Sequence, residues 1–481
     1  MANSDLHPGV AQTRRHFYGQ CGLSLGSMAA LGMCSAAGGE RPSFASEASN
    51  LPRPHFPARA KSVIYLFMGG GPSQLELFDP KPKLQQMNGQ PIPESYLEKR
   101  RFAFLNKQKA LLLGSVRKFA KYGKSGQELA DVLPHLSKVC DELAIVRSMK
   151  TDFFNHGPAK LFLQTGSSRP GRPSMGAWAT YGIGSEAQDL PAFVVLQSGS
   201  RGPRGGAALW GSGFLPTRHQ GMLLRNEGDP ILDLTNPPGV SSTSQRHTVT
   251  ALNALNAERL SSTGDPEIST RIASYEMAFR MQTSAPELVD FTRESQQTKR
   301  LYGIEDDRPS FARNCLLARR LIERGVRFVQ LYHTEWDHHG GILENSLTDG
   351  LVARCRETDQ PSAALIQDLK ERGLLDQTLV IWGGEFGRTP MAEDREPRGR
   401  DHHVDAFTIW LAGGGIQGGQ TLGKTDEFGF SVVEDLVHVH DLQATVLKLL
   451  GMDHLKLTYR FQGREFRLTD IGGRVVDKLL A

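Results

Sequence analysis

The sequence has few cysteines, little excess charge and no long apolar run in its body, and each shortage excludes a class of protein. Its 481 residues include 5 cysteines at scattered positions, which form neither a disulfide framework nor a zinc motif. The formal net charge is only +4 and no nucleic-acid-binding motif appears, so we expect no nucleic-acid partner. With 39% hydrophobic and 22% charged residues, the composition is typical of a globular protein.

The first 48 residues predict an export signal and linker. Arg14 and Arg15 stand in a segment, Thr13–Tyr18, that is similar to a twin-arginine export motif, and a Gly- and Ala-rich run over 21–37 follows. That run is too short and too rich in glycine to stay in a bilayer, so we predict no permanent membrane span in the mature chain. We expect a periplasmic protein, with a basic tail before a buried helix as the alternative.

Short apolar runs alternate with helical patterns along residues 49–481, which we interpret as one domain. Unbroken apolar runs predict buried strands at 63–67, 143–146, 193–196, 326–332, 378–382 and 406–411. Amphipathic spacing predicts helices at 128–140, 156–164, 265–281, 310–323, 362–372 and 442–450. This alternation indicates an α/β fold, doubly wound, with a mostly parallel sheet and helices on both faces.

One stretch, 197–249, departs from this alternation because it is rich in Gly, Pro, Ser and Arg. It predicts a long surface excursion near the site, or alternatively a disordered insert.

Polar residues cluster next to the predicted strands. Ligands bind at the carboxyl ends of strands in open α/β sheets, and three polar segments follow strands there. These segments contain Ser73, Gln74 and Glu76; Glu335, Asp337, His338 and His339; and Glu385 and Arg388. A fourth, Arg400–His403, precedes its strand instead.

Imidazole and carboxylate together are ligands preferred by zinc, iron and manganese. Asp337 and His339 lie two apart on an extended segment and can point the same way, while Glu385 with His402 or His403 could complete the set. Arg388 has a fixed fork of donors that suits a phosphate or sulfate group. The alternative is a hydrogen-bonded network that anchors loops without a metal.

Four motifs, in order along residues 61–473, resemble a bacterial family of unknown function, domain-of-unknown-function family 1501, which is placed with the alkaline-phosphatase and sulfatase superfamily. They are Met68–Ser73 continuing through Asp79–Pro82, Trp336–Gly340, Gly384–Pro390 and Gly399–His402. The resemblance implies an alkaline-phosphatase-like fold and a hydrolase of phosphate or sulfate esters.

The resemblance also implies an incomplete metal site. Met68–Gly70 stands where the superfamily places a first-strand aspartate ligand, and Gln74 and Glu76 stand where family members often carry His and Asp. The metal ligands implied to remain are Asp337 with His338 or His339, Glu385 and His402, and we predict His339 for the open choice. They would hold one divalent ion, which could be zinc, manganese, calcium or iron.

The segment from His156 to Gly166 resembles the sulfatase nucleophile segment, but has His156 at the nucleophile position and Lys160 in place of arginine. An ordinary sulfatase mechanism is therefore excluded on this alignment. His156 becomes a candidate nucleophile or general acid, Ser73 a second candidate nucleophile, and Lys160 and Arg388 candidate substrate-binding residues.

These residues and the resemblance are consistent with two functions. The first is an exported metal-assisted hydrolase acting on an anionic ester. The second is a catalytically inactive protein that binds sulfated or otherwise anionic glycans, through arginines embedded in Gly and Pro, or serves in assembly. Those arginines are Arg169, Arg172, Arg201 and Arg204. The sequence does not define the oligomeric state.

Overall fold

A computed structural model describes residues 54–97, 109–199, 201–225, 230–231, 234–392 and 395–481. The described residues belong to one unit that spans Leu51–Ala481. The predicted export signal and linker lie outside them. Among the described helices, none is both long enough and apolar enough to cross a membrane.

The centre of this unit is a nine-stranded sheet built by described residues. Its order is β12 (Gln420–Leu422), β4 (Leu143–Lys150), β11 (Phe407–Ala412), β8 (Thr378–Gly383), β1 (Ser62–Met68), β7 (Phe328–His333), β5 (Phe193–Ser198) and β6 (Met222–Leu223), with β15 (Val437–His438) beside β4. All six predicted strands are confirmed. Strands β1, β7 and β8 are fully buried, as their unbroken apolar runs predict.

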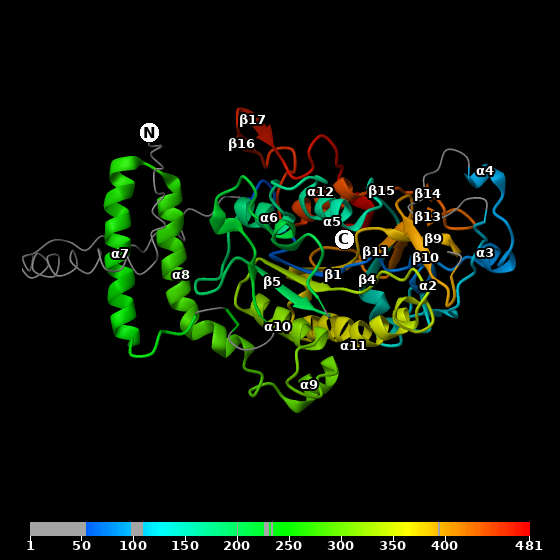
Figure 1. Cartoon of the computed structure of the whole chain (residues 1–481), viewed down its shortest axis with the longest axis horizontal. Coiled ribbons are helices and arrows are strands. Elements are labelled where there is room, and N and C mark those ends of the chain that lie inside the picture. Colours follow the sequence, from blue (N-terminus) through cyan, green and yellow to red (C-terminus); the bar gives the residue numbers. More distant parts are fainter. Residues whose placement is uncertain (1–53, 98–108, 200, 226–229, 232–233, 393–394) are drawn as a thin grey trace, which may run out of the picture. The chain divides into compact units, whose positions relative to one another are not determined.

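Helices cover both faces of the sheet, so the doubly wound α/β prediction is confirmed (Figure 1). One face packs against α10 (Phe311–Glu323) and α11 (Gly350–Glu371). The other packs against α5 (His156–Thr165), α6 (Met175–Ile183) and α12 (Val439–Leu449). Small elements complete the fold: α2 (Gln74–Leu77), α3 (Pro82–Gln86), α4 (Glu94–Leu97), α9 (Gln296–Tyr302), β2 (Phe119–Tyr122), β9 (Gly387–Ala392), β10 (Arg400–His403), β13 (Lys424–Thr425), β14 (Val432–Glu434), β16 (Tyr459–Phe461) and β17 (Arg464–Phe466).

The direction of β11 determines where the site forms. It runs antiparallel to both neighbours, β4 and β8, with Trp410 opposite Trp382 and Phe407 opposite Met149. Its beginning therefore lies at the edge where β8 and β1 end. This geometry explains why Arg400–His403, which precedes a strand, meets segments that follow strands.

Two helix predictions need correction. Residues 128–140 do not form an α-helix, since β3 (Gln127–Ala130) and a 3₁₀ segment (Leu136–Glu142) occupy them. The predicted helix at 362–372 is only the second half of α11, which begins at Gly350 and continues through Pro361. The remaining helix predictions are confirmed, and that at 265–281 lies within α8 (Pro266–Val289).

The stretch 197–249 is not an insert without structure where it is described. It contributes β6 to the sheet, buries Leu209, Trp210 and Leu215 in the core, and leads into α7 (Ser242–Thr263). Helix α7 packs against α8, and none of its residues is buried.

Candidate metal centre and adjoining cleft

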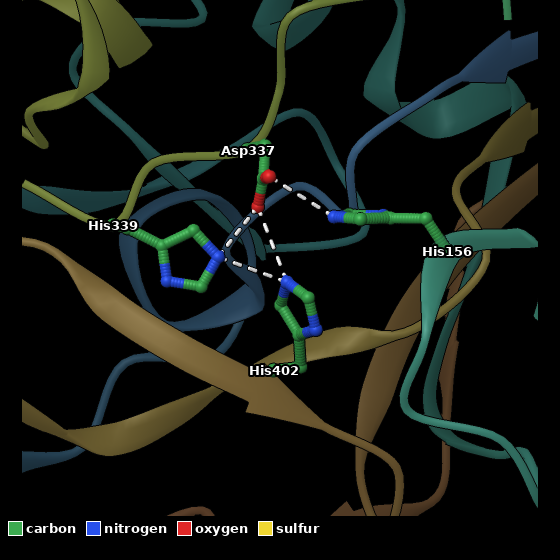
Figure 2. Close-up of side chains that lie close together, drawn as sticks. All are labelled: His156, Asp337, His339 and His402. Atoms are coloured by element: carbon green, nitrogen blue, oxygen red, sulfur yellow. Dashed lines mark hydrogen bonds and ion pairs between the residues drawn. The ribbon is translucent and has the colours of Figure 1, made fainter. Parts of the chain in front are cut away.

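Four side chains from three separate parts of the chain converge at the carboxyl edge of the sheet. They are His156 at the start of α5, Asp337 and His339 in the loop after β7, and His402 on β10. One ligand atom from each lies within 4.8 Å of the others. Figure 2 shows the three imidazole rings pointing at the Asp337 carboxylate. We call these four residues the His₃Asp cluster.

Asp337 is the centre of the cluster. Its Oδ1 lies 2.8 Å from His339 Nε2 and 3.2 Å from His402 Nε2, and its Oδ2 lies 3.0 Å from His156 Nε2. The Nε2 atoms of His339 and His402 are themselves only 2.9 Å apart. Three imidazole nitrogens and one carboxylate therefore share a volume the size of one ion's coordination sphere.

His156 and His402 use their other nitrogen to bind the protein. His156 Nδ1 lies 2.7 Å from Glu385 Oε1, and His402 Nδ1 lies 2.6 Å from the carbonyl oxygen of Phe154. Both partners are acceptors, so each Nδ1 carries the proton and donates it. In a neutral ring, Nε2 is then unprotonated and points at the cluster. Outer hydrogen-bond partners orient the histidine ligands of metal sites in the same way.

The protonation states argue for a cation between these atoms. Burial, together with the charge of Arg388 and of His156, lowers the pKa of His402 to about 4 although Asp337 opposes the shift, so this ring is neutral near pH 7. Burial opposes ionisation of Asp337, but Arg388 and the three histidines hold its pKa far below the ordinary range. A neutral His402 thus directs a lone pair at an anionic oxygen, an arrangement that a bound cation makes favourable.

His156 behaves differently from His402 because two carboxylates face it. Burial lowers its pKa, but hydrogen bonds to Asp337 and Glu385 outweigh burial and raise that pKa above the ordinary value. A proton or a metal ion on Nε2 would satisfy the same pair of carboxylates. The donor set of three imidazoles and one carboxylate fits zinc, iron or manganese, and it argues against calcium, which takes oxygen ligands.

Glu385, expected as a ligand, lies behind His156 instead. Its carboxylate accepts from the Gly70 backbone N–H at 3.1 and 3.2 Å and lies 3.5 Å from Lys160 Nζ. Burial opposes its ionisation, but Lys160 and His156 bring its pKa to about 2. Glu385 therefore stays ionised and orients His156. The fourth position of the cluster belongs to His156, which sequence reasoning placed in the chemistry but not among the ligands.

Arg388 also has a different set of partners from those expected. Its side chain is 1% exposed, and Nε and Nη1 donate to the carbonyls of Gly71 at 2.9 Å and Arg400 at 3.0 Å. Its Nη2 donates to the Gly70 carbonyl and to Asp337 Oδ1, the latter at 2.6 Å. The guanidinium fork is thus occupied by the protein, so its part is to hold the loops and Asp337 rather than a substrate anion.

Ser73 is buried against a second pair of charges. Its Oγ donates to Glu76, which also accepts from Arg400 Nη2 at 2.8 Å and Nε at 3.0 Å. Glu76 and Arg400 are both 0% exposed. Ser73 thus stands at the N-cap position of α2 without a capping hydrogen bond, and its hydroxyl belongs to a buried ion-pair network instead of facing the cluster.

The structure shows which of two adjacent histidines belongs to the cluster, both at 338 and 339 and at 402 and 403. His338 is buried outside the cluster and His403 Nε2 lies 2.7 Å from the Phe430 carbonyl, so His339 and His402 supply the cluster. Sequence reasoning missed Phe386, whose ring centroid lies 5.0 Å from that of His156 and 4.4 Å from that of His402. It also missed the carbonyl of Phe154. A backbone acceptor leaves no signal in a sequence.

An open cleft adjoins the cluster. His156 and Asp337 line it together with the charged side chains of Lys160, Arg201, Arg204 and Glu335. Lys160 is 5% exposed at its side chain, whereas Arg201 is 57% exposed. The excursion from residue 197 therefore contributes to the cleft wall, as predicted. Arg172 lies elsewhere, against Asp470 and the Phe466 ring.

The fold and cluster together define an α/β protein with a candidate metal centre at the carboxyl edge of its sheet. The sequence matches the family described as "Protein of unknown function (DUF1501)" over residues 60–480. The chain belongs to this family, and the resemblance seen in its four motifs is confirmed. No curated protein matches it.

Several solved structures align with the chain at low similarity. The lipoteichoic acid synthase LtaP from Listeria monocytogenes is 10% identical with a TM-score of 0.37, covering 86% of this chain and 76% of that one. The PsFucS1 sulfatase from Pseudoalteromonas sp. is 13% identical with a TM-score of 0.33, covering 82% and 68%. The alkaline phosphatase from the Antarctic bacterium TAB5 is 10% identical with a TM-score of 0.32, covering 82% and 99%.

Proposed function

We propose that this protein is a metal-assisted hydrolase of phosphate or sulfate esters that uses one divalent ion. The observation that carries the proposal is the convergence of His156, Asp337, His339 and His402 within 4.8 Å, beside a cleft whose lining includes three basic side chains. A divalent ion held by these four residues would supply Lewis acidity toward an ester oxygen. Zinc, manganese and iron are the candidate ions on ligand chemistry.

The chain's own residues divide the remaining tasks. Glu385 holds His156 by Nδ1 and keeps Nε2 facing the cluster. Arg388 fixes Asp337 and the loop at Gly70 and Gly71. Lys160 brings a buried positive charge to the cleft beside His156, where it favours a phosphate or sulfate group over a neutral ester.

The alternative is a binding protein without catalytic activity, and one observation favours it. Of the two candidate nucleophiles, His156 is part of the cluster and Ser73 donates to Glu76. Under this alternative, Arg201 and Arg204 in the cleft would bind an anionic glycan.

Metal content and turnover separate the two functions. Elemental analysis of the full chain should find about one divalent ion per chain, and that ion should be lost in Asp337→Ala and His402→Ala. Hydrolysis of phosphate and sulfate monoesters and diesters should then depend on the ion. His247→Ala, on exposed helix α7, is the control histidine variant and should keep both metal and activity. Absence of metal and of turnover would refute the hydrolase.

The same measurements decide the alternative. Glycan binding that persists in the Asp337→Ala, His402→Ala double variant, without turnover in the parent protein, would favour the binding protein.

We also propose that the protein is exported to the periplasm by the twin-arginine route. The support is Arg14-Arg15 in its motif context. Replacing both arginines by lysine should leave the protein in the cytoplasmic fraction, while the parent protein fractionates with the periplasm.

A further inference from the structure

We propose that the cleft beside the His₃Asp cluster binds a second anionic group of the ligand on Arg201, and that Glu335 occupies Arg201 until this group displaces it. The inference rests on the proposed function for the group bound at the cluster. It narrows the substrate class to esters that carry a further phosphate, sulfate or carboxylate.

Strand register brings Arg201 and Glu335 together. Strands β5 and β7 run parallel with Ser198 opposite His333, so the residues that follow each strand leave the sheet side by side. The Thr334 Oγ1 donates to the Arg201 carbonyl at 2.9 Å, which ties the two loops. Asp337 lies two residues beyond Glu335, so the cleft and the cluster share one loop.

The Glu335 carboxylate shows what Arg201 can bind. Arg201 Nε lies 2.7 Å from Glu335 Oε1, and Nη2 lies 3.4 Å from Oε2, a forked contact. The same planar fork fits a phosphate or a sulfate. Glu335 thus stands where an acidic group of a ligand would bind.

This ion pair is suited to exchange. The Arg201 side chain is 57% exposed and that of Glu335 is 28% exposed, and ion pairs in contact with water contribute little to stability. Glu335 also has a φ of 73°, a left-handed backbone that is uncommon for a residue other than glycine and that is often found at functional sites. A phosphate or sulfate group of a ligand can therefore compete with the Glu335 carboxylate for Arg201.

The surrounding charges favour an anion at this place. Arg204 lines the same cleft, and among the described residues it forms no ion pair. Lys160 lines it near the cluster. Two residues of extended chain span at most about 7 Å, so the backbone at Glu335 and at Asp337 lies close together and the cleft adjoins the cluster.

The test measures binding of sugar phosphates by calorimetry on the metal-loaded full chain at 0.15 M salt. The probes are glucose 1-phosphate and glucose 1,6-bisphosphate, with mono- and disulfated disaccharides as a second pair that distinguishes phosphate from sulfate ligands. The parent protein should prefer the doubly anionic member of at least one pair by about tenfold. Arg201→Ala should abolish that preference, and Glu335→Gln should increase affinity for the doubly anionic probe by a few fold.

A second exposed pair provides matched controls. Arg308 lies 2.6 Å from Asp306 and is 86% exposed, so Arg308→Ala and Asp306→Asn change net charge in the same way outside the cleft. These variants should bind as the parent does. The inference is overturned if Arg201→Ala keeps the preference, or if Arg308→Ala loses it equally.

The outcome is separable from that of the proposed function. A preference that depends on Arg201 in a protein without metal or turnover would support the subsite and refute the hydrolase. Turnover without any such preference would support the hydrolase and refute the subsite.

Discussion

Glu76 and Asp337 are both carboxylates held against an arginine at the same edge of the sheet, but their surroundings differ. Glu76 accepts from Nε and Nη2 of Arg400 and from Ser73, while Nη1 and Nη2 of Arg400 also donate to the carbonyls of Thr389 and Gly114. Each nitrogen of the guanidinium thus has a protein partner, and both side chains are fully buried. This pair is complete without any ligand.

Asp337 has the opposite balance. It meets one guanidinium and three imidazole nitrogens, and the protein already supplies an acceptor to the far nitrogen of His156 and His402. At His402, whose proton is on Nδ1, an acceptor nitrogen therefore faces an acceptor oxygen of Asp337 at 3.2 Å. Burial of charge alone therefore does not indicate a metal site, whereas a shortage of protons among converging ligand atoms does.

The largest expected effect is the loss of stability when the ion pair between Glu76 and Arg400 is broken. Glu76→Ala leaves the Arg400 guanidinium buried without its partner, and breaking such a pair costs about 3–5 kcal/mol of the free energy of unfolding. Denaturant unfolding of the metal-free chain measures this. A loss below 1 kcal/mol would show that the pair does not stabilise the fold.

His402→Ala should have a large effect on metal affinity and a smaller effect on stability. It removes one of the four ligands, so metal affinity should fall by more than about 100-fold, the upper end of the effect expected for an outer partner. In the metal-free chain the free energy of unfolding should change less than in Glu76→Ala. Chelator competition measures the affinity. Unchanged affinity would remove His402 from the metal site.

Glu385→Gln tests the outer partner of the cluster. The substitution keeps an acceptor for His156 Nδ1 but removes the negative charge, so metal affinity should fall by about 10- to 100-fold. Glu142→Gln, at an ion pair between Glu142 and Lys370 away from the site, is the matched control and should not change it. Equal affinity in both variants would show that the negative charge of Glu385 does not contribute to metal binding.

A buried histidine outside the cluster gives the smallest effect. Burial and the neighbouring Arg218 lower the pKa of His219 to about 4, below an ordinary value of about 6.5. Between these values the unfolded chain binds the proton first, so stability is present above pH 6.5 and is lost as the pH falls toward 4. The free energy of unfolding should decrease by about 2 kcal/mol between pH 7 and pH 5 through this residue.

The control for that pH effect is His219→Gln, which cannot titrate. Unfolding curves for the two chains should diverge in this range. Parallel pH profiles would show that His219 is not responsible.

The sequence predicts the sheet well because its central strands are buried on both faces. Val63–Phe67 and Thr378–Trp382 lack the alternation of polar and apolar residues that marks a strand with one exposed face. The direction of β11 has no local signal, since it depends on which neighbours the strand meets. Helix α7 escaped prediction because its polar, Ser- and Thr-rich face is solvated and none of its residues is buried.

For the site, residue types next to predicted strands were sufficient to find Asp337 and His339, which follow a strand, and His402, which precedes one. They were insufficient for His156, Glu385 and Arg388, whose roles depend on which of several polar neighbours each side chain meets. Glu385 and His156 lie 229 positions apart in the chain and are in contact only through the fold. Arg388 bonds carbonyl oxygens, which every residue has and no motif reveals.

The Arg388 fork joins the turn after β1, the loop after β7 and strand β10 at one point. The three chain segments that carry Gly70, Asp337 and His402 are therefore fastened together by the protein itself. An arriving ion would enter a cage assembled beforehand, so chelation should empty the centre while the surrounding loops keep their protection from hydrogen exchange. Small zinc-dependent domains behave in the opposite way, because they unfold when their metal is removed.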